Sequence, residues 1–242
     1  MSSTIRTPDD PTLGQLCHEL EEHAAALDTS EAWPEHQLRL CGEFGVYRWF
    51  ASQTWGGCEW SEADVIRGYL RLSAACLTTT FILTQRAGAC RRIEASDNEA
   101  LKAELLPPLV EGSAFATVGI SHLTTSRRHL GRPALVAEES GDAFVLDGYS
   151  PWVTGGGHAQ WMVTGATLED GRQILVALPT DLPVVEAAQP VHLIGLNASH
   201  TGAVHCRRVK VERRWLLAGP TENVMAQGSG ASTGGLQTST LA

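Results

Sequence analysis

The stretch LPPLVEGSAFATVGI, residues 106–120, marks a change in the spacing of apolar residues along the chain. Before it, apolar residues recur at three- and four-residue steps, as on one face of an α-helix. After Ser113 the chain breaks into short apolar, β-branched segments that are typical of strands. The sequence therefore predicts an α+β fold: a helical N-terminal domain followed by an antiparallel β-sandwich or barrel.

Working back from this stretch, the apolar spacing predicts helices over residues 13–27, 33–50, 61–73 and 74–93. Ser61 is the expected N-cap of the third helix, because an acidic residue, Asp64, stands three positions later. The segment Ser96-Asp97-Asn98-Glu99 reads as a capping box that opens a fifth, short helix. We expect Pro107 and Pro108 to stop that helix.

Working forward, strand-like segments recur down to residue 211, and turn residues at 139–142 and 169–172 predict hairpins between them. The expected strands are residues 115–120, 134–137, 144–146, 152–154, 161–166, 174–178, 191–196 and 204–211. After Pro220 the chain becomes small and polar, as in a flexible tail.

Composition excludes several classes of function. The chain of 242 residues has a net charge of −9 and no cluster of Lys and Arg, so neither nucleic acid nor an anionic membrane surface is an expected partner. No apolar run is long enough to span a membrane, and the N-terminus lacks the layout of a signal peptide. Six scattered cysteines fit reduced thiols, and no metal-site motif is present. We therefore expect a cytoplasmic protein without a metal site.

The segment DGYSPWVTGG, residues 147–156, offers two readings. Its glycines follow a strand, but the lysine and serine or threonine of a phosphate-binding loop are missing, as is the GxGxxG pattern. Trp152 and Thr154 stand two residues apart and would share one face of a regular strand. An aromatic plane beside a hydroxyl suits a flat heteroaromatic ligand. Spacing alone leaves open the alternative of an ordinary strand with one buried tryptophan.

Several motifs, in order, resemble the acyl-CoA dehydrogenase family. Trp55-Gly56-Gly57 before the Ser61 helix resembles its Tyr-Gly-Gly segment, and DGYSPWVTGG resembles its NGxKxWITN strand. The family's LPPL helix end is matched by NEALKAELLPPLVEG (98–112), and the end of its β domain by LNASHTGAVHCRRVKVERRWLLAGP (196–220). Gly234-Gly235-Leu236-Gln237 resembles the start of its C-terminal helical bundle. The resemblance implies a helical domain over 1–111, a β domain over 112–220, and a linker over 221–242 that begins a bundle absent here.

The resemblance also implies FAD as the cofactor and assigns residues to it. Trp152 and Thr154 match the strand that lies against the flavin, where the threonine hydroxyl bonds near N5, and Val153 would add backbone contact. Ile120 and Ser121 fall on the Leu-Thr pair of the other flavin strand.

The rest of that second strand departs from the family pattern. His122 and Leu123 replace its Glu-Pro pair, and no Gly-Ser-Asp follows. Ser126 is the nearest counterpart of the serine at the FAD pyrophosphate, and Arg127-Arg128 either neutralises a diphosphate or forms a solvated turn.

The implied activity is α,β-dehydrogenation of an acyl thioester, with hydride transfer to flavin N5. An acyl-CoA-type substrate, an electron-transfer partner and a homo-oligomer of the full-length protein belong to the same expectation. In the family the catalytic glutamate lies on the C-terminal bundle, so no base is assigned among residues 1–242. A flavin-dependent monooxygenase of the same fold, a non-catalytic or partner-dependent flavin-binding subunit, and a β-sandwich binding module without a cofactor are the alternatives.

Overall fold

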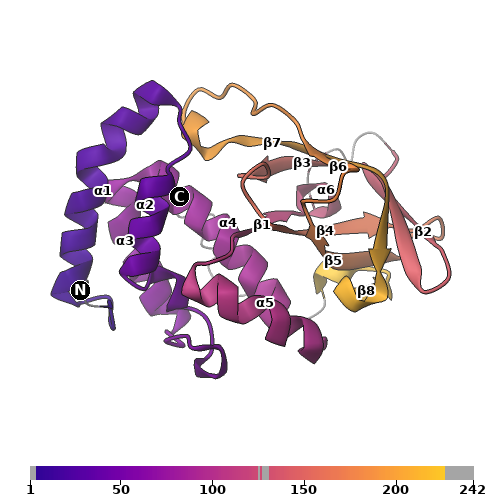
Figure 1. The fold of residues 1–242 in the computed structure, drawn as a ribbon, viewed down its shortest axis with the longest axis horizontal. Coiled ribbons are helices and arrows are strands. Elements are labelled where there is room, and N and C mark those ends of the chain that lie inside the picture. The colour runs from indigo at the N-terminus through magenta and orange to yellow at the C-terminus, as the bar shows by residue number, and fades with distance from the viewer. Residues whose placement is uncertain (1–3, 125, 127–130, 227–242) are drawn as a thin grey trace.

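The computed structural model describes residues 4–124, 126 and 131–226. Helices fill one side of the molecule and strands the other, with α4 and α5 nearest the strands (Figure 1). The helices are α1 (Pro11–Ser30), α2 (Glu35–Glu43), α3 (Glu62–Ala75), α4 (Leu77–Glu94), α5 (Glu99–Glu111) and the single turn α6 (Ser121–Thr124). The predicted α+β fold class is confirmed. None of the helices in the described part combines the length and apolar character that a membrane crossing requires.

The cap of α3 agrees with its prediction. The Ser61 hydroxyl accepts a hydrogen bond from Asp64 N at 3.2 Å. The cap of α5 differs, because Asn98 takes that position and its side chain accepts from Leu101 N at 3.1 Å. The Ser96 hydroxyl instead donates to a carbonyl at the end of α4. The prediction of a capping box at Ser96 was therefore wrong.

The prolines of α5 do not stop it, which also corrects the prediction. The helix runs through Pro107 and Pro108 to Glu111 and ends at Gly112, in the left-handed region at φ 88°. An internal proline removes a helical hydrogen bond and costs about 3 kcal/mol. Four buried apolar side chains on both sides of the prolines offset this cost. They are Leu105, Leu106, Leu109 and Val110.

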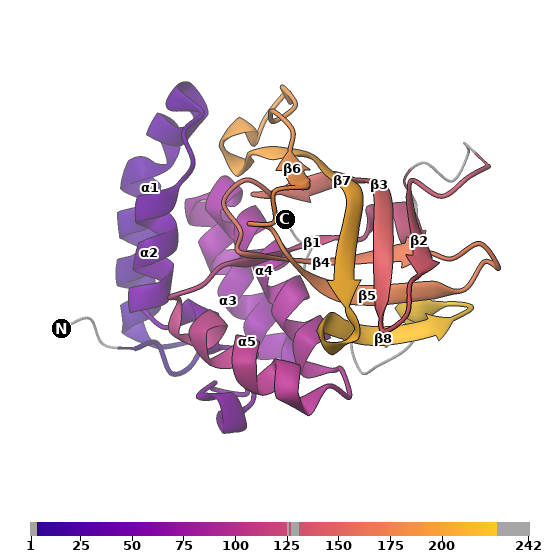
Figure 2. The ribbon, with the colours of Figure 1, turned by 45° about the vertical axis from the view of Figure 1, so that its right-hand side comes forward.

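Eight strands form one connected sheet in the order β6-β7-β3-β2-β4-β5-β8, with β1 paired to β4. Their bounds are β1 Ala116–Gly119, β2 Leu135–Glu139, β3 Ala143–Thr154, β4 Trp161–Thr167, β5 Gln173–Pro179, β6 Val185–Ala187, β7 Thr201–Glu212 and β8 Leu216–Thr221. A single pair, Val136 with Thr167, joins β2 to β4. The sheet thereby folds into two sections, and Figure 2 shows β3 and β7 crossing over β4 and β5.

Three details of the β part differ from the sequence prediction. Strand β1 is parallel to β4, so the sheet is not entirely antiparallel. Residues 191–196 form no strand, and the edge strand is β6, a few residues earlier. Two expected segments, 144–146 and 152–154, belong to the single long strand β3. The hairpins at 139–142 and 169–172 are confirmed, because β2–β3 and β4–β5 are antiparallel pairs.

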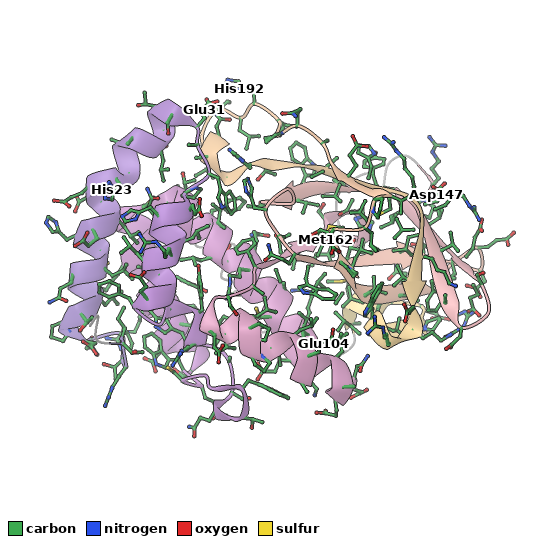
Figure 3. All side chains as sticks on the ribbon, viewed as in Figure 1. His23, Glu31, Glu104, Asp147, Met162 and His192 are labelled. Carbon is green, nitrogen blue, oxygen red and sulfur yellow. The ribbon has the colours of Figure 1, made fainter. Side chains whose placement is uncertain are left out.

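Two apolar clusters hold the molecule together. One lies among α1–α4, and the other joins α4 and α5 to the strands. Met162 of β4, labelled near the centre of Figure 3, is fully buried in the second cluster. Because α4 and α5 contribute to this core, the helical part and the β part share buried surface, which holds the end of β3 in place against the helices.

Candidate functional site

The segment after β1 and the end of β3 lie next to each other. Ser121 opens α6, and its hydroxyl donates to Pro151 O in β3 at 3.2 Å. Ile120, one residue earlier, is half-buried against the core. The structure thus brings Ile120 and Ser121 beside the Trp152 segment, although about thirty residues separate them along the chain.

Trp152 is held outward by a β-bulge. Between the pairs Ser150–Val204 and Val153–Gly202, two residues of β3 face only one residue of β7. Trp152 has φ 57°, a conformation that few residues other than glycine adopt, and 49% of its surface is exposed. The regular pleat that placed Trp152 and Thr154 on one face is therefore interrupted at this point. The bulge leaves a broad aromatic plane in solvent at the end of β3.

Thr154 and Val153 are buried, at 2% and 1% exposure, so Trp152 and Thr154 do not share an exposed face. The Thr154 hydroxyl lies 2.9 Å from the hydroxyl of Thr201 in β7, and Thr154 O accepts from the Thr117 hydroxyl of β1. The hydroxyl expected to reach a flavin is thus paired inside the protein. The sequence gives no sign of this partner, because Thr201 belongs to a strand far along the chain.

Ser126 lies one turn beyond Ser121, where Ser126 N donates to Ser121 O at 2.8 Å. It lines an open cavity of about 250 Å³ together with His122 and Arg132. The pair Arg127-Arg128 and the segment at 234–237 lie outside the described residues. The roles of Ile120, Ser121, Ser126, Trp152, Val153 and Thr154 toward a cofactor remain predictions.

His122 occupies the position where the family pattern has an acid. Its Nε2 donates to Gly165 O at 2.7 Å, so in the neutral ring Nδ1 is an acceptor. Nδ1 is buried, and it has no hydrogen-bond partner within the described part of the chain. Burial lowers the pKa of His122, opposed by the hydrogen bond to Gly165. Burial therefore favours the neutral ring.

Gly155, the first of the glycines at 155–157, allows close packing against Trp33. Gly155 has φ 64°, and a Cβ there would lie 2.5 Å from the indole of Trp33. Its N–H donates to the carbonyl oxygens of Ser199 and His200. A backbone N–H in use inside the protein is not available to an anion, so the structure favours the reading without a phosphate loop.

Sequence reasoning missed a ring cluster beside these glycines. Trp33 stacks on His158 with ring centres 4.1 Å apart, and His158 Nε2 lies 2.9 Å from His200 Nδ1. His200 Nε2 in turn donates to Glu31 O at 2.9 Å, and Figure 3 labels Glu31 beside His192. The cluster ties the segment between α1 and α2 to the β part. Trp33 lies more than a hundred residues from both histidines, and the histidines lie 42 residues from each other, so no local pattern could indicate the cluster.

We expect the stability of the protein to fall as the pH drops below about 6.5, the ordinary pKa of histidine. Burial, and then the neighbouring His200, lower the pKa of His158, while Glu35 raises it slightly. A histidine whose pKa is lowered by folding binds its proton more readily in the unfolded chain. Its contribution is therefore complete above the unfolded pKa and is lost as the pH falls through the window below it. Urea unfolding at pH 7.5 and 5.5 measures the loss.

The control is wild type. His158→Gln should reduce the difference in unfolding free energy between pH 7.5 and 5.5, because glutamine does not titrate. An equal pH difference in wild type and His158→Gln would contradict the assignment.

The chain matches the family model of the acyl-CoA dehydrogenase N-terminal domain over residues 15–113. Among curated proteins it is similar to YngJ of Bacillus subtilis, named a probable acyl-CoA dehydrogenase, with 25% identity over 84% of this chain and 55% of that protein. The short-chain-specific acyl-CoA dehydrogenase of Clostridium acetobutylicum is 27% identical over 60% of this chain and 38% of its own length. The chain thus spans about half the length of these relatives, or less.

Solved structures show the same fold. Butyryl-CoA dehydrogenase from Megasphaera elsdenii superposes with a TM-score of 0.78 at 18% identity, over 90% of this chain and 60% of that one. A glutaryl-CoA dehydrogenase from Mycobacterium smegmatis, in complex with FADH2, has a TM-score of 0.75 at 19% identity, over 94% of this chain and 61% of that one. The helical part, the β part and their arrangement are therefore those of these enzymes.

Proposed function

Because this chain belongs to the acyl-CoA dehydrogenase family, we propose that it is a flavoprotein that holds FAD against the end of β3. The proposal rests on the exposure of the Trp152 side chain. At a β-bulge its side chain is 49% exposed, and the carbonyl of the preceding residue, Pro151, accepts a hydrogen bond from the Ser121 hydroxyl. A positive φ at an exposed tryptophan costs folding free energy, and such strained residues cluster at ligand-binding sites. Stacking of a flat ligand ring on the indole would offset that cost.

The described residues fit a flavin in three ways. Trp152 offers an exposed plane for the ring. Ser121 offers a partly buried hydroxyl beside the end of β3. The third group is the hydroxyl of Thr154, which is buried and paired with Thr201, so a flavin would have to replace that pairing. Val153, between Trp152 and Thr154, is buried in the apolar core. A bound flavin supplies the hydride acceptor that no amino-acid side chain provides.

For the substrate, we propose an acyl thioester of the acyl-CoA type, oxidised between its α and β carbons. The proposal rests on the curated relatives, which are named as acyl-CoA dehydrogenases. We assign no catalytic base within this chain. Cytoplasmic location, a homo-oligomer and an electron-transfer partner belong to the proposal as well, the last because one structural neighbour is titled an electron transferring flavoprotein.

The test is FAD binding by the purified protein, followed by flavin absorbance and calorimetry. We expect Trp152→Ala to weaken FAD binding about tenfold through lost stacking. We expect Thr154→Val to weaken it about fivefold through one lost hydrogen bond. Leu70→Ala, an apolar truncation on α3 at 48% exposure, is the matched control and should change nothing. A colourless protein that cannot be reconstituted with FAD would refute the proposal, and unchanged affinity in both variants would refute the placement.

A further inference from the structure

A cavity of about 590 Å³ lies at the junction of the helical part and the β part. The end of α4, the start of α5 and strands β5 and β8 contribute to its wall, whereas Trp152 and Ser121 do not. Cavities that bind small molecules commonly lie at such junctions and have largely apolar walls with a few polar groups. The apolar side chains of this wall are Leu175, Leu216, Leu217, Val224 and Met225.

Arg92, at the end of α4, brings an unpaired charge to this wall. Its half-buried guanidinium donates from Nη1 to Gly88 O at 2.9 Å, and it forms no ion pair within the described part of the chain. The residues outside that part contain no Asp or Glu, so none of their side chains supplies a carboxylate. Burial, and then the neighbouring Arg91, lower the pKa of Arg92. The charged guanidinium is therefore less well stabilised here than in water.

The end of α4 compensates this charge only in part. The carbonyl end of a helix acts as about half a negative charge. It is shared by Arg91 and Arg92, which both lie in the last turn of α4. Glu94 adds one negative charge to the same turn, against two positive ones, and its carboxylate accepts a hydrogen bond from Ser52 N. Positive charge therefore remains beside the cavity.

The other charged groups of the wall favour a ligand with a single negative charge. Arg213 is already paired with Glu139 and Asp142, at 3.5 and 3.6 Å. Asp97 also lines the cavity and would repel a second negative charge on a ligand. Nε and Nη2 of Arg92 make no hydrogen bond to the described residues, and these two nitrogens match the two oxygens of a carboxylate.

We propose that this cavity binds a carboxylate with an apolar chain. Its oxygens pair with the Arg92 guanidinium, and its chain lies against the apolar wall. This site is separate from the proposed flavin site and does not depend on FAD. A carboxylate there supplies the partner that Arg92 lacks, and the chain removes apolar wall from water.

Hydrogen bonds hold the wall of the cavity in place. The side chain of Asn98, at the start of α5, donates to Arg214 O and Leu216 O at 2.8 and 3.0 Å. Val224 N donates to the side-chain oxygen of Gln173 at 3.3 Å. A ligand therefore meets a cavity that is already formed, which favours binding because little of the wall has to be ordered.

The test is calorimetry of the purified protein with octanoate and with octanamide, which has the same chain and shape but no charge. We expect wild type to bind octanoate at least about tenfold more tightly than octanamide, because a charge-assisted hydrogen-bonded pair is lost with the amide. Arg92→Gln should remove this preference and leave the affinity for octanamide unchanged. Arg92→Lys keeps the charge but loses the paired donors, so it should weaken octanoate binding about threefold.

Three further variants control for charge and place. Arg91→Gln removes the neighbouring cation, which lies over the ring of Phe50 and does not line the cavity, and should leave the preference for octanoate in place. Asp97→Asn removes a negative charge from the wall and should tighten octanoate binding. Ala95→Phe puts a larger side chain in the wall and should weaken the binding of both ligands.

The proposal is overturned if wild type binds the two ligands equally, or if Arg92→Gln binds octanoate as wild type does. Tighter binding of inorganic phosphate than of octanoate would overturn the carboxylate assignment. Octanoate could also enter a site for acyl chains elsewhere in the protein. If Ala95→Phe, still folded by circular dichroism, bound octanoate as wild type does, the ligand would lie outside this cavity and the proposal would fail.

Discussion

Replacing Gly148 by alanine is expected to prevent the protein from reaching a stable fold. Gly148 lies in the middle of β3 with φ 125°, and a Cβ there would lie 2.2 Å from the backbone oxygen of Ala134. A backbone atom cannot swing aside as the end of a side chain can. The strain and overlap should cost at least about 4 kcal/mol, a large part of the 5–15 kcal/mol that stabilises a typical domain. Far-UV circular dichroism and urea unfolding measure the effect.

The matched control is Gly141→Ala, in the turn between β2 and β3. Gly141 also has a positive φ, at 60°, but a Cβ there would meet no atom within 4 Å. Only the backbone penalty remains, and it should cost about 1 kcal/mol. A Gly148→Ala protein with an unfolding free energy close to that of Gly141→Ala would contradict the argument.

The reason for this sensitivity lies in the course of β3. At Gly148 the strand pairs with Leu135 on one side and Cys206 on the other, and its register with β7 shifts between Leu146 and Gly148. A second shift follows at the bulge before Val153. These two irregularities turn the end of β3 toward α6 and expose Trp152. The glycine therefore fixes the direction of the strand that carries the proposed flavin contacts.

Local chemistry made much of the fold predictable. Apolar spacing located the first four helices, and the Ser61 cap was correct because its partner Asp64 is only three residues away. The cap at Ser96 failed for an equally local reason, since Asn98 competes for the same role two residues later. The prediction that Pro107 and Pro108 stop the helix failed because the free-energy cost of a proline is a local property. The burial of apolar side chains that offsets this cost depends on distant strands.

The candidate site was less predictable, because its geometry depends on pairing between distant segments. Trp152 could be singled out from its sequence context, but the bulge that exposes it follows from the register of β3 against β7. The link from Thr154 to Thr201 depends on the same register. Likewise, only the folded chain shows that Gly155 makes room for Trp33.

Trp33 gives the second large effect that we expect. Trp33→Ala should lower the free energy of unfolding by about 3 kcal/mol, the usual cost of truncating a packed aromatic side chain. Its indole stacks on His158 with an angle of 6° between the rings, and it meets Phe115 edge-on with ring centres 5.7 Å apart. Both contacts cross from the helical part to the β part. Truncation would remove both ring contacts and enlarge the open cavity that Trp33 lines with Phe115 and His158.

Two control variants sharpen this prediction in urea unfolding at pH 7.5. Trp152→Ala removes the same side chain at a site that is half exposed, and should cost less than about 1 kcal/mol. Trp33→Phe keeps an aromatic ring against His158 and should recover part of the loss. If Trp33→Ala were no more destabilising than Trp152→Ala, the ring cluster would not join the two parts of the protein. Since Gly155 packs against Trp33 directly after Thr154, a loss at Trp33 should also loosen the end of β3.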